Sequence, residues 1–201
     1  MNFQEKKNLY KVRQTVLEMI SDRGYVIPSH MLAITFEQFS IQYDQKNIDL
    51  YIENEDKEKK YYVYFHTDVS FGKNDMKNVV QKITNQYQYE NLGIIILLKE
   101  KESTSIQKEK VKPMYKSVEF FEQRKMTFNI TKHVFVPKHV IMTPEEEASV
   151  VEKYETPKSK FPKISVNDPV ARYYAMKPEQ MCKIIRNDPE VGLSISYRIV
   201  K

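Results

Sequence analysis

The side chains best suited to chemistry gather between residues 129 and 147. His133 and His139 flank Pro137 in the stretch NITKHVFVPKH, and three glutamates follow in TPEEEASVV. If the stretch is extended, the two histidines face one side about 20 Å apart, too far for one metal ion to bridge. The glutamates fall in the first turn of a predicted helix, where the helix dipole favours negative charge. The pattern therefore predicts structural or interface residues and no metal site.

A nuclease centre is the second chemistry to consider. A helix, a hairpin, a helix and a strand form the layout of restriction-endonuclease-like folds, which hold a divalent ion with an aspartate on one strand and Glu-x-Lys on the next. Asp49 could be the first acid, but the following strands, YYVYFH and GIIILL, supply no second carboxylate. The chain also lacks a glycine-rich phosphate loop and a G-x-S-x-G motif. We therefore expect no catalytic residue, no cofactor and no small-molecule substrate, with an active nuclease kept as a rival hypothesis.

Bulk properties indicate a protein of the cell interior. The chain has 201 residues, a net charge of +5 and one cysteine, Cys182, which excludes an internal disulfide and suits a reducing compartment. Cys182 is expected to be a small core residue. The longest apolar run, GIIILL at 93–98, is far too short to cross a membrane, and the polar N-terminus has no signal pattern. We expect no membrane contact.

A lysine-rich break lies at residues 99–112, KEKESTSIQKEKVK. Its lysines at 108, 110 and 112 could neutralise DNA phosphates, which requires only positive charge on a tether. The same composition is typical of a solvated loop or linker, and no aromatic residue is interleaved there to stack on bases. A free-standing DNA-binding module is therefore a second rival hypothesis.

The first half has an α/β pattern. Apolar residues between Leu9 and Ile20 recur every three or four positions and predict a helix that Arg23 and Gly24 end. Thr35 and Gln38 form a capping box for a short second helix. Further predicted elements are strands at 47–53 and 61–66 joined by a turn at 54–60, a helix at 73–87, and a buried strand beginning at Gly93.

The second half is punctuated by capping signals. Thr143, Pro144 and Glu146 predict a helix that runs to about Tyr154, and Asp168 starts another short one. SVEFFEQRK is interpreted as a short helix and MTFNIT as a strand, while 181–186 and 193–200 are strands joined by the turn NDPEVG. With a seam between about 99 and 128, we predict two modules, residues 1–125 and 126–201.

From residue 129 on, the order and spacing of short motifs say more about the family than amino-acid composition could. NITKH, VPKH, FPKI, NDPVARYY, Lys177, CKIIR, Gly192 and YRIV follow in one order and close spacing. This resembles the fifth-largest shared subunit of eukaryotic RNA polymerases, whose C-terminal half is similar to a small subunit of the archaeal polymerase. TVLEMISDRGYVI, FEQFSIQY and MKNVVQKITNQYQYENLGIIILL agree with the N-terminal half, so the resemblance spans nearly the whole chain.

The resemblance implies a non-catalytic assembly subunit. Its expected fold is α/β (α+β): a restriction-endonuclease-like N-terminal jaw module beside downstream duplex DNA, and a small mixed-sheet C-terminal assembly module with two short helices. The C-terminal module is expected to dock on the largest polymerase subunit and to contact other subunits. The partner-binding candidates are His139, Asp168, Arg172, Tyr173, Lys183 and Arg186. Two of them have simpler alternatives, because Asp168 could only cap its helix and Tyr173 could be core.

The chain also departs from the family. Relatives carry T-P-S-A, which contacts DNA in them, in the loop after the buried strand, where this chain has Thr104 and Ser105 without the proline. The nearby lysines are substitute candidates for that contact. The candidate DNA contacts are therefore Thr104, Ser105, Lys108, Lys110 and Lys112. Compactness and a composition rich in Lys, Asn, Ile and Tyr suggest a large DNA virus as the source. The expected location is the nucleus if the protein is cellular, and a cytoplasmic viral factory or the virion if it is viral.

Overall fold

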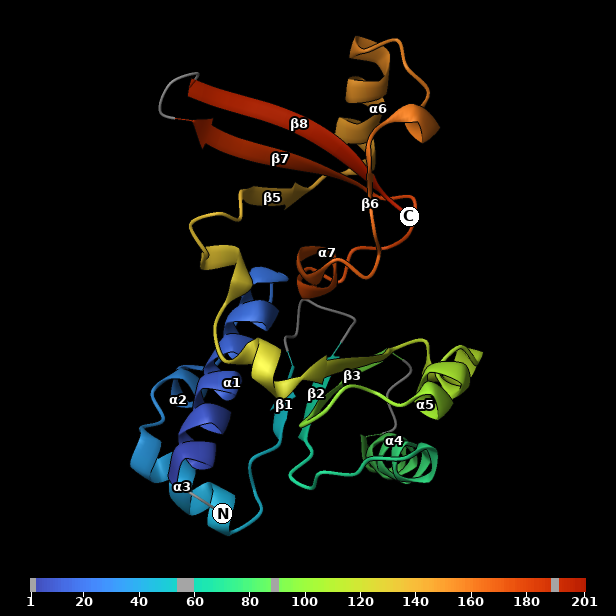
Figure 1. Cartoon of the computed structure of the whole chain (residues 1–201). Coiled ribbons are helices and arrows are strands. Elements are labelled where there is room, and N and C mark those ends of the chain that lie inside the picture. The colour runs from blue at the N-terminus through green and yellow to red at the C-terminus, as the bar shows by residue number, and fades with distance from the viewer. Residues whose placement is uncertain (1–2, 54–59, 88–90, 189–191) are drawn as a thin grey trace. The chain divides into compact units, whose positions relative to one another are not determined.

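The chain folds into two compact units, Met1–Phe128 and Asn129–Lys201. The computed structural model describes residues 3–53, 60–87, 91–188 and 192–201 (Figure 1). The predicted module boundary, between residues 125 and 126, falls inside the first unit. None of the described helices is long and apolar enough to cross a membrane.

The first unit is a four-stranded sheet between two layers of helices. Its strands are β1 (Leu50–Ile52), β2 (Lys60–Phe65), β3 (Leu92–Leu98) and β4 (Val118–Glu122), in the order β1-β2-β3-β4. The β1–β2 pair is antiparallel, as the predicted hairpin requires, and the other two pairs are parallel. Every residue of β3 is buried, which confirms the predicted central strand. The predicted turn at 54–60 lies, except for Lys60, outside the described residues.

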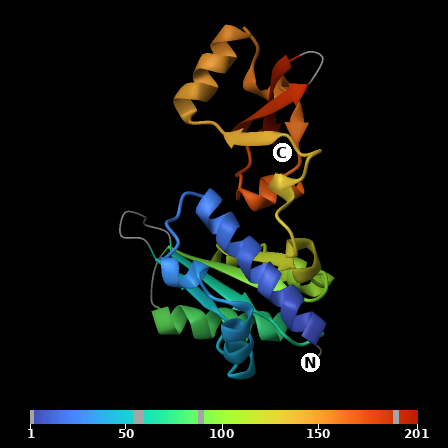
Figure 2. The same cartoon turned by 90° about the vertical axis from the view of Figure 1, so that its left-hand side faces the viewer.

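Helices cover both faces of this sheet. On one face lie α1 (Phe3–Asp22), α2 (Ser29–Leu32) and α3 (Phe36–Asp44), and on the other α4 (Lys73–Tyr87) and α5 (Thr104–Glu109). Figure 2 looks onto the α1 side, with α1 lying across the sheet. Even-numbered residues of β3 point to the α4 side, where they join one apolar cluster with α4 and with Ile106 of α5. The capping box of Thr35 and Gln38 is present at the start of α3, as predicted.

Arg23, at the end of α1, has a larger role than the predicted helix-end cation. Its guanidinium donates to both carboxylate oxygens of Glu119 on β4, at 3.0 and 2.8 Å, and to the Tyr61 hydroxyl at 3.3 Å. The following Gly24 has a φ of +89°, the left-handed conformation that only glycine adopts without strain. Arg23 therefore joins the end of α1 to the sheet beneath it.

Three predictions between residues 99 and 131 are wrong. The lysine-rich break is not a linker, because it contains α5 and buries Ile106 in the core. SVEFFEQRK is not a helix: its apolar residues form β4, which pairs with β3, and a 3-10 helix, η2 (Gln123–Met126), follows. MTFNIT is not a strand, since it passes from η2 into a second 3-10 helix, η3 (Ile130–Lys132). The proposed seam of 99–128 thus belongs to the first unit.

The second unit is a mixed sheet with one helix on each face. Its strands are β5 (Lys138–Ile141), β6 (Lys163–Ile164), β7 (Met181–Asp188) and β8 (Gly192–Val200), in the order β5-β7-β8-β6. β7 pairs antiparallel with both β5 and β8, and β6 pairs parallel with β8. Helix α6 (Pro144–Lys153) packs on one face and α7 (Pro169–Tyr173) on the other (Figure 1). The turn predicted between the hairpin strands lies partly outside the described residues.

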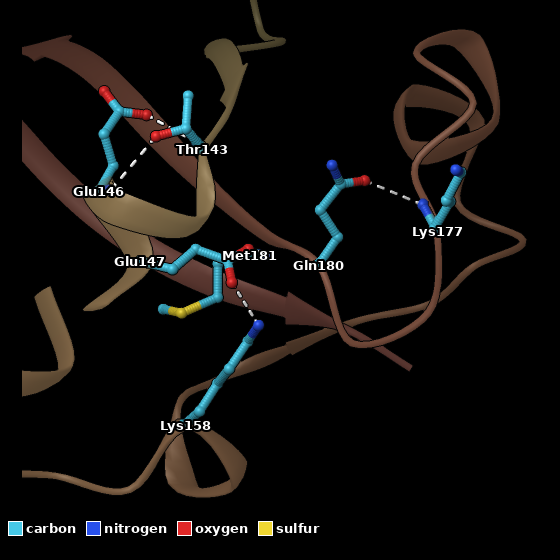
Figure 3. A network of polar contacts seen from close by, with 7 residues as sticks. All are labelled: Thr143, Glu146, Glu147, Lys158, Lys177, Gln180 and Met181. Carbon is cyan, nitrogen blue, oxygen red and sulfur yellow. Dashed lines mark hydrogen bonds and ion pairs between the residues drawn. The ribbon is translucent and has the colours of Figure 1, made fainter. Parts of the chain in front are cut away.

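Glu147 fixes α6 to the sheet. One carboxylate oxygen accepts from the Met181 backbone N–H at 2.6 Å, and the other pairs with the Lys158 ammonium group (Figure 3). One turn earlier, Thr143 and Glu146 form the predicted capping box. The glutamates that could have suggested acid–base chemistry therefore cap and anchor a helix.

Candidate interaction surfaces

Helix α7 carries three of the predicted partner contacts. Asp168 is its N-cap, and Oδ1 accepts from the backbone N–H groups of Val170 at 2.8 Å and Ala171 at 3.4 Å. This cap stabilises the first turn of the proline-started helix. Arg172 lies half-buried in the same helix.

Tyr173 is an internal residue of the second unit. Its side chain is 2% exposed, and its hydroxyl accepts a hydrogen bond of 2.8 Å from the buried Asn129 amide. Asn129 in turn accepts from the Thr131 backbone N–H at 3.0 Å and the Thr131 hydroxyl at 2.7 Å. Tyr173 therefore ties α7 to the segment that opens this unit, and its contact with a partner stays a prediction.

The sheet divides the other candidates between its two faces. Strand register places His139, Ile184 and Arg186 on the α7 face, because His139 is opposite Ile184 and side chains alternate along a strand. Lys183 is one residue away from Ile184 and therefore lies on the α6 face, opposite Tyr197. Five candidates thus lie on α7 or on the face that it covers, and Lys183 does not.

The two histidines do not lie along one extended stretch, contrary to the prediction from their spacing. His133 ends η3, and its carbonyl accepts from Val136 N–H at 2.9 Å in a turn. His139 lies beyond that turn, in β5, and its Nδ1 donates to the Pro137 carbonyl at 2.7 Å. Within the described ranges, no group of three or more His, Cys, Asp or Glu side chains could hold a metal ion.

Asp49 of the first unit is held by hydrogen bonds to strand β2. Its carboxylate accepts from the Tyr62 hydroxyl at 2.9 Å and from the Phe65 backbone N–H at 2.9 Å. Burial raises the pKa of Asp49 despite these hydrogen bonds. Both carboxylate oxygens therefore support strand β2.

The lysine-rich region forms a basic cluster around a buried carboxylate. Glu109, at the end of α5, lies 2.7 Å from Lys112, 2.9 Å from Lys73 and 3.6 Å from Lys77. Hydrogen bonds from Lys112 and then Lys73 lower the pKa of Glu109 to about 2, and Glu109 raises the pKa of Lys112. Sequence reasoning missed Lys73 and Lys77 because they lie on α4, which only the fold brings beside α5.

The remaining DNA-contact candidates differ in their surroundings. Lys110 pairs with Glu102 at 2.7 Å and lies 5.8 Å from the Phe120 ring centre. Lys108 is exposed, as are Thr104 and Ser105 in the first turn of α5. Four lysines pair with Glu102 or Glu109, namely Lys73, Lys77, Lys110 and Lys112. With Lys108, which lies on the same helix as Glu109, the five lysines exceed the two glutamates by three positive charges.

Two segments of the chain match the two domains of one known protein family. Residues 4–83 match the family "RNA polymerase Rpb5, N-terminal domain", and residues 128–200 match "RNA polymerase Rpb5, C-terminal domain". The chain belongs to the Rpb5 family. The prediction from sequence is thereby confirmed for the family, for the mixed α/β fold of its two domains, and for a structural role in transcription by DNA-directed RNA polymerase.

Relatives in the Rpb5 family align over almost the whole chain. "DNA-directed RNA polymerases I, II, and III subunit RPABC1" of Caenorhabditis elegans is 32% identical over 98% of this chain and 97% of its own length. The protein of the same description from Dictyostelium discoideum is 30% identical over 95% and 96%. "DNA-directed RNA polymerases IV and V subunit 5B" of Arabidopsis thaliana is 28% identical over 95% and 88%. Neither Rpb5 domain match includes residues 84–127, the segment that holds Lys108, Lys110 and Lys112.

Proposed function

We propose that this chain is a non-catalytic structural subunit of a multisubunit DNA-directed RNA polymerase. Its second unit docks on the largest subunit, and its first unit forms part of the jaw beside downstream duplex DNA. One observation carries the assignment: both Rpb5 domains match in order on one chain, and the relatives align over nearly their full length. Its place of action is that of the polymerase, the nucleus for a cellular protein and the viral factory or virion for a viral one.

The environment of Asp49 supports a non-catalytic role. A divalent ion of a nuclease needs carboxylate oxygens that are open to it, with a second acid on the next strand. Asp49 instead accepts hydrogen bonds from Tyr62 and Phe65. The next strand carries no acid, because β2 has the sequence KYYVYF. A purified chain that cleaves duplex DNA with Mg²⁺ would overturn this part of the proposal.

The docking surface is the α7 side of the second unit. Arg172 and Arg186 are its anchors, because guanidinium groups give directed hydrogen bonds together with apolar contact area. His139 lies on the same face, Asp168 caps α7, and Tyr173 ties α7 to Asn129. Lys183 is a separate contact on the opposite face.

The basic cluster of α4 and α5 supplies the DNA contact. Its excess positive charge attracts phosphates without regard to sequence, and each neutralised phosphate adds to the salt dependence of binding. Lys108 is the strongest candidate, because Lys110 and Lys112 already pair with Glu102 and Glu109. Thr104 and Ser105 add exposed hydroxyl groups at the start of the same helix.

The deciding experiment is affinity capture of the tagged chain from its native source, followed by a high-salt wash and mass spectrometry. Recovery of the two large polymerase subunits at equal stoichiometry supports the proposal. Recovery of the chain alone, or with DNA only, contradicts it and favours a free-standing DNA-binding module. Arg172→Ala with Arg186→Ala should abolish recovery, while Lys163→Ala, an exposed lysine of β6 on the other face, should not.

A further inference from the structure

Strand β8 has an open edge along most of its length. On one side it pairs with β7 from Gly192 to Ile199. On the other side its neighbour is β6, which reaches only Ile199 and Val200. Within the part of the chain that the structure describes, no strand covers the outer edge of β8 from Gly192 to Arg198.

Hydrogen bonds at the covered end show which backbone groups point outward. The N–H groups of Ile199 and Lys201 donate away from β7, to the carbonyls of Pro162 and Ile164 at 2.9 Å. The N–H of Val200 donates to the Gln180 carbonyl, on the β7 side. Because these directions alternate along a strand, the N–H and C=O groups of Leu193, Ile195 and Tyr197 face the open edge.

The two faces of β8 carry different kinds of side chain along this edge. On the α6 face, Tyr197 meets the ring of Tyr154, but Leu193 is 68% exposed and Ile195 44% exposed. On the α7 face the same stretch carries Ser194, Ser196 and Arg198, with Arg186 opposite Ser194. Between Met181 and Asn187 of β7 and between Leu193 and Val200 of β8, the charged side chains are Lys183, Arg186 and Arg198, which are all basic.

We propose that an extended segment of another polymerase subunit adds to the outer edge of β8 as a further strand. Such an edge presents unpaired backbone groups to any chain of matching conformation, and proteins use it for recognition. The added strand carries apolar side chains against Leu193 and Ile195, and carboxylates on the face of Arg186 and Arg198. The inference rests on the proposed function for its partner, and the outer edge of β8 adjoins the α7 docking face, with which it shares the face of Arg186.

Residue-resolved deuterium exchange tests the pairing directly. The assembled polymerase is exchanged, quenched and read by electron-transfer fragmentation, with the free chain measured in parallel. The outward amides of Leu193, Ile195 and Tyr197 should exchange quickly in the free chain and at least a hundredfold more slowly in the assembly. The amides of Ser194 and Ser196, which donate to β7, should be protected in both and serve as internal controls.

A proline substitution tests the same hydrogen bonds by affinity. Ile195→Pro removes an outward N–H and no bond to β7, which is the position where an edge strand accepts proline. It should weaken assembly about tenfold, the effect expected from one lost backbone hydrogen bond. Ile195→Thr keeps the N–H and the branched side chain, and should weaken assembly less.

The outcomes separate this inference from the proposed function. If the wild-type chain does not join polymerase subunits at all, both are overturned. If it joins them while the three outward amides still exchange at their free rates, the proposed function stands and the added strand is refuted. If protection instead rises with concentration in the free chain, the occupant is a second copy, which also refutes the inference.

Discussion

The contact between Arg23 and Glu119 offers a quantitative test of the first unit. Substituting Arg23 with alanine leaves the Glu119 carboxylate without its guanidinium partner at the junction of α1 and β4. Breaking a buried ion pair costs about 3–5 kcal/mol, because the remaining charge stays partly desolvated. The Arg23 side chain is 4% exposed but that of Glu119 is 23% exposed, so the cost should lie at the lower end, about 3 kcal/mol.

Hydrogen exchange of the buried β3 amides is the assay, because it reports the opening of the first unit separately from the second. A loss of about 3 kcal/mol should accelerate the exchange of amides such as Ile95 roughly a hundredfold. The control is the double substitution Arg23→Met with Glu119→Leu, which removes both charges. Since apolar replacement of both partners is often neutral, the double variant should recover most of the stability. A single substitution that costs less than about 1 kcal/mol, or a double variant no more stable than Arg23→Ala, would refute the reasoning.

Three further predictions follow from other contacts. The pKa of Glu109 is lowered to about 2 from 4.5, so ionised Glu109 stabilises the fold above pH 4.5 and this contribution is lost as pH falls through about 2. Glu109→Gln should therefore lower the midpoint of urea unfolding at pH 7 and match wild type near pH 2. Tyr173→Phe removes the hydrogen bond to Asn129 and should lower the stability measured by thermal unfolding by about 1 kcal/mol. The variant should still capture the polymerase. Lost capture with an unchanged melting temperature would make Tyr173 a direct contact. Leu193→Ser should change stability by less than about 0.5 kcal/mol, because the side chain is exposed; a larger loss would mean that it packs within the unit.

The proposed jaw contact with DNA leads to a last prediction, on salt dependence. Lys108→Ala in the assembled polymerase should weaken binding to downstream duplex and reduce the salt slope by about 1, because one phosphate contact is lost. Lys46→Ala, an exposed lysine after α3, is the matched control and should leave the slope unchanged. Equal slopes for both variants and wild type would remove Lys108 from the DNA contact.

Local sequence signals determined most helices and the paired strands. The capping boxes at Thr35 and Thr143 act within four residues, and the apolar period of α1 and α4 depends only on helical geometry. The order of motifs from residue 129 onward was specific enough to indicate the family that the comparisons then confirmed. These features need no knowledge of what packs against them.

Only the tertiary structure decided the segment from 99 to 131. The six-residue α5 is too short to show a helical period, and VEFFE becomes a strand because β3 offers it a parallel partner. The fold also brought Lys73 and Lys77 to Glu109, buried Tyr173 against Asn129, and placed Lys183 on the face opposite His139. These outcomes depend on contacts between residues that are far apart in the chain. Helix caps and periodic apolar faces depend only on residues close in sequence, which is why the sequence by itself determined them and the rest required the fold.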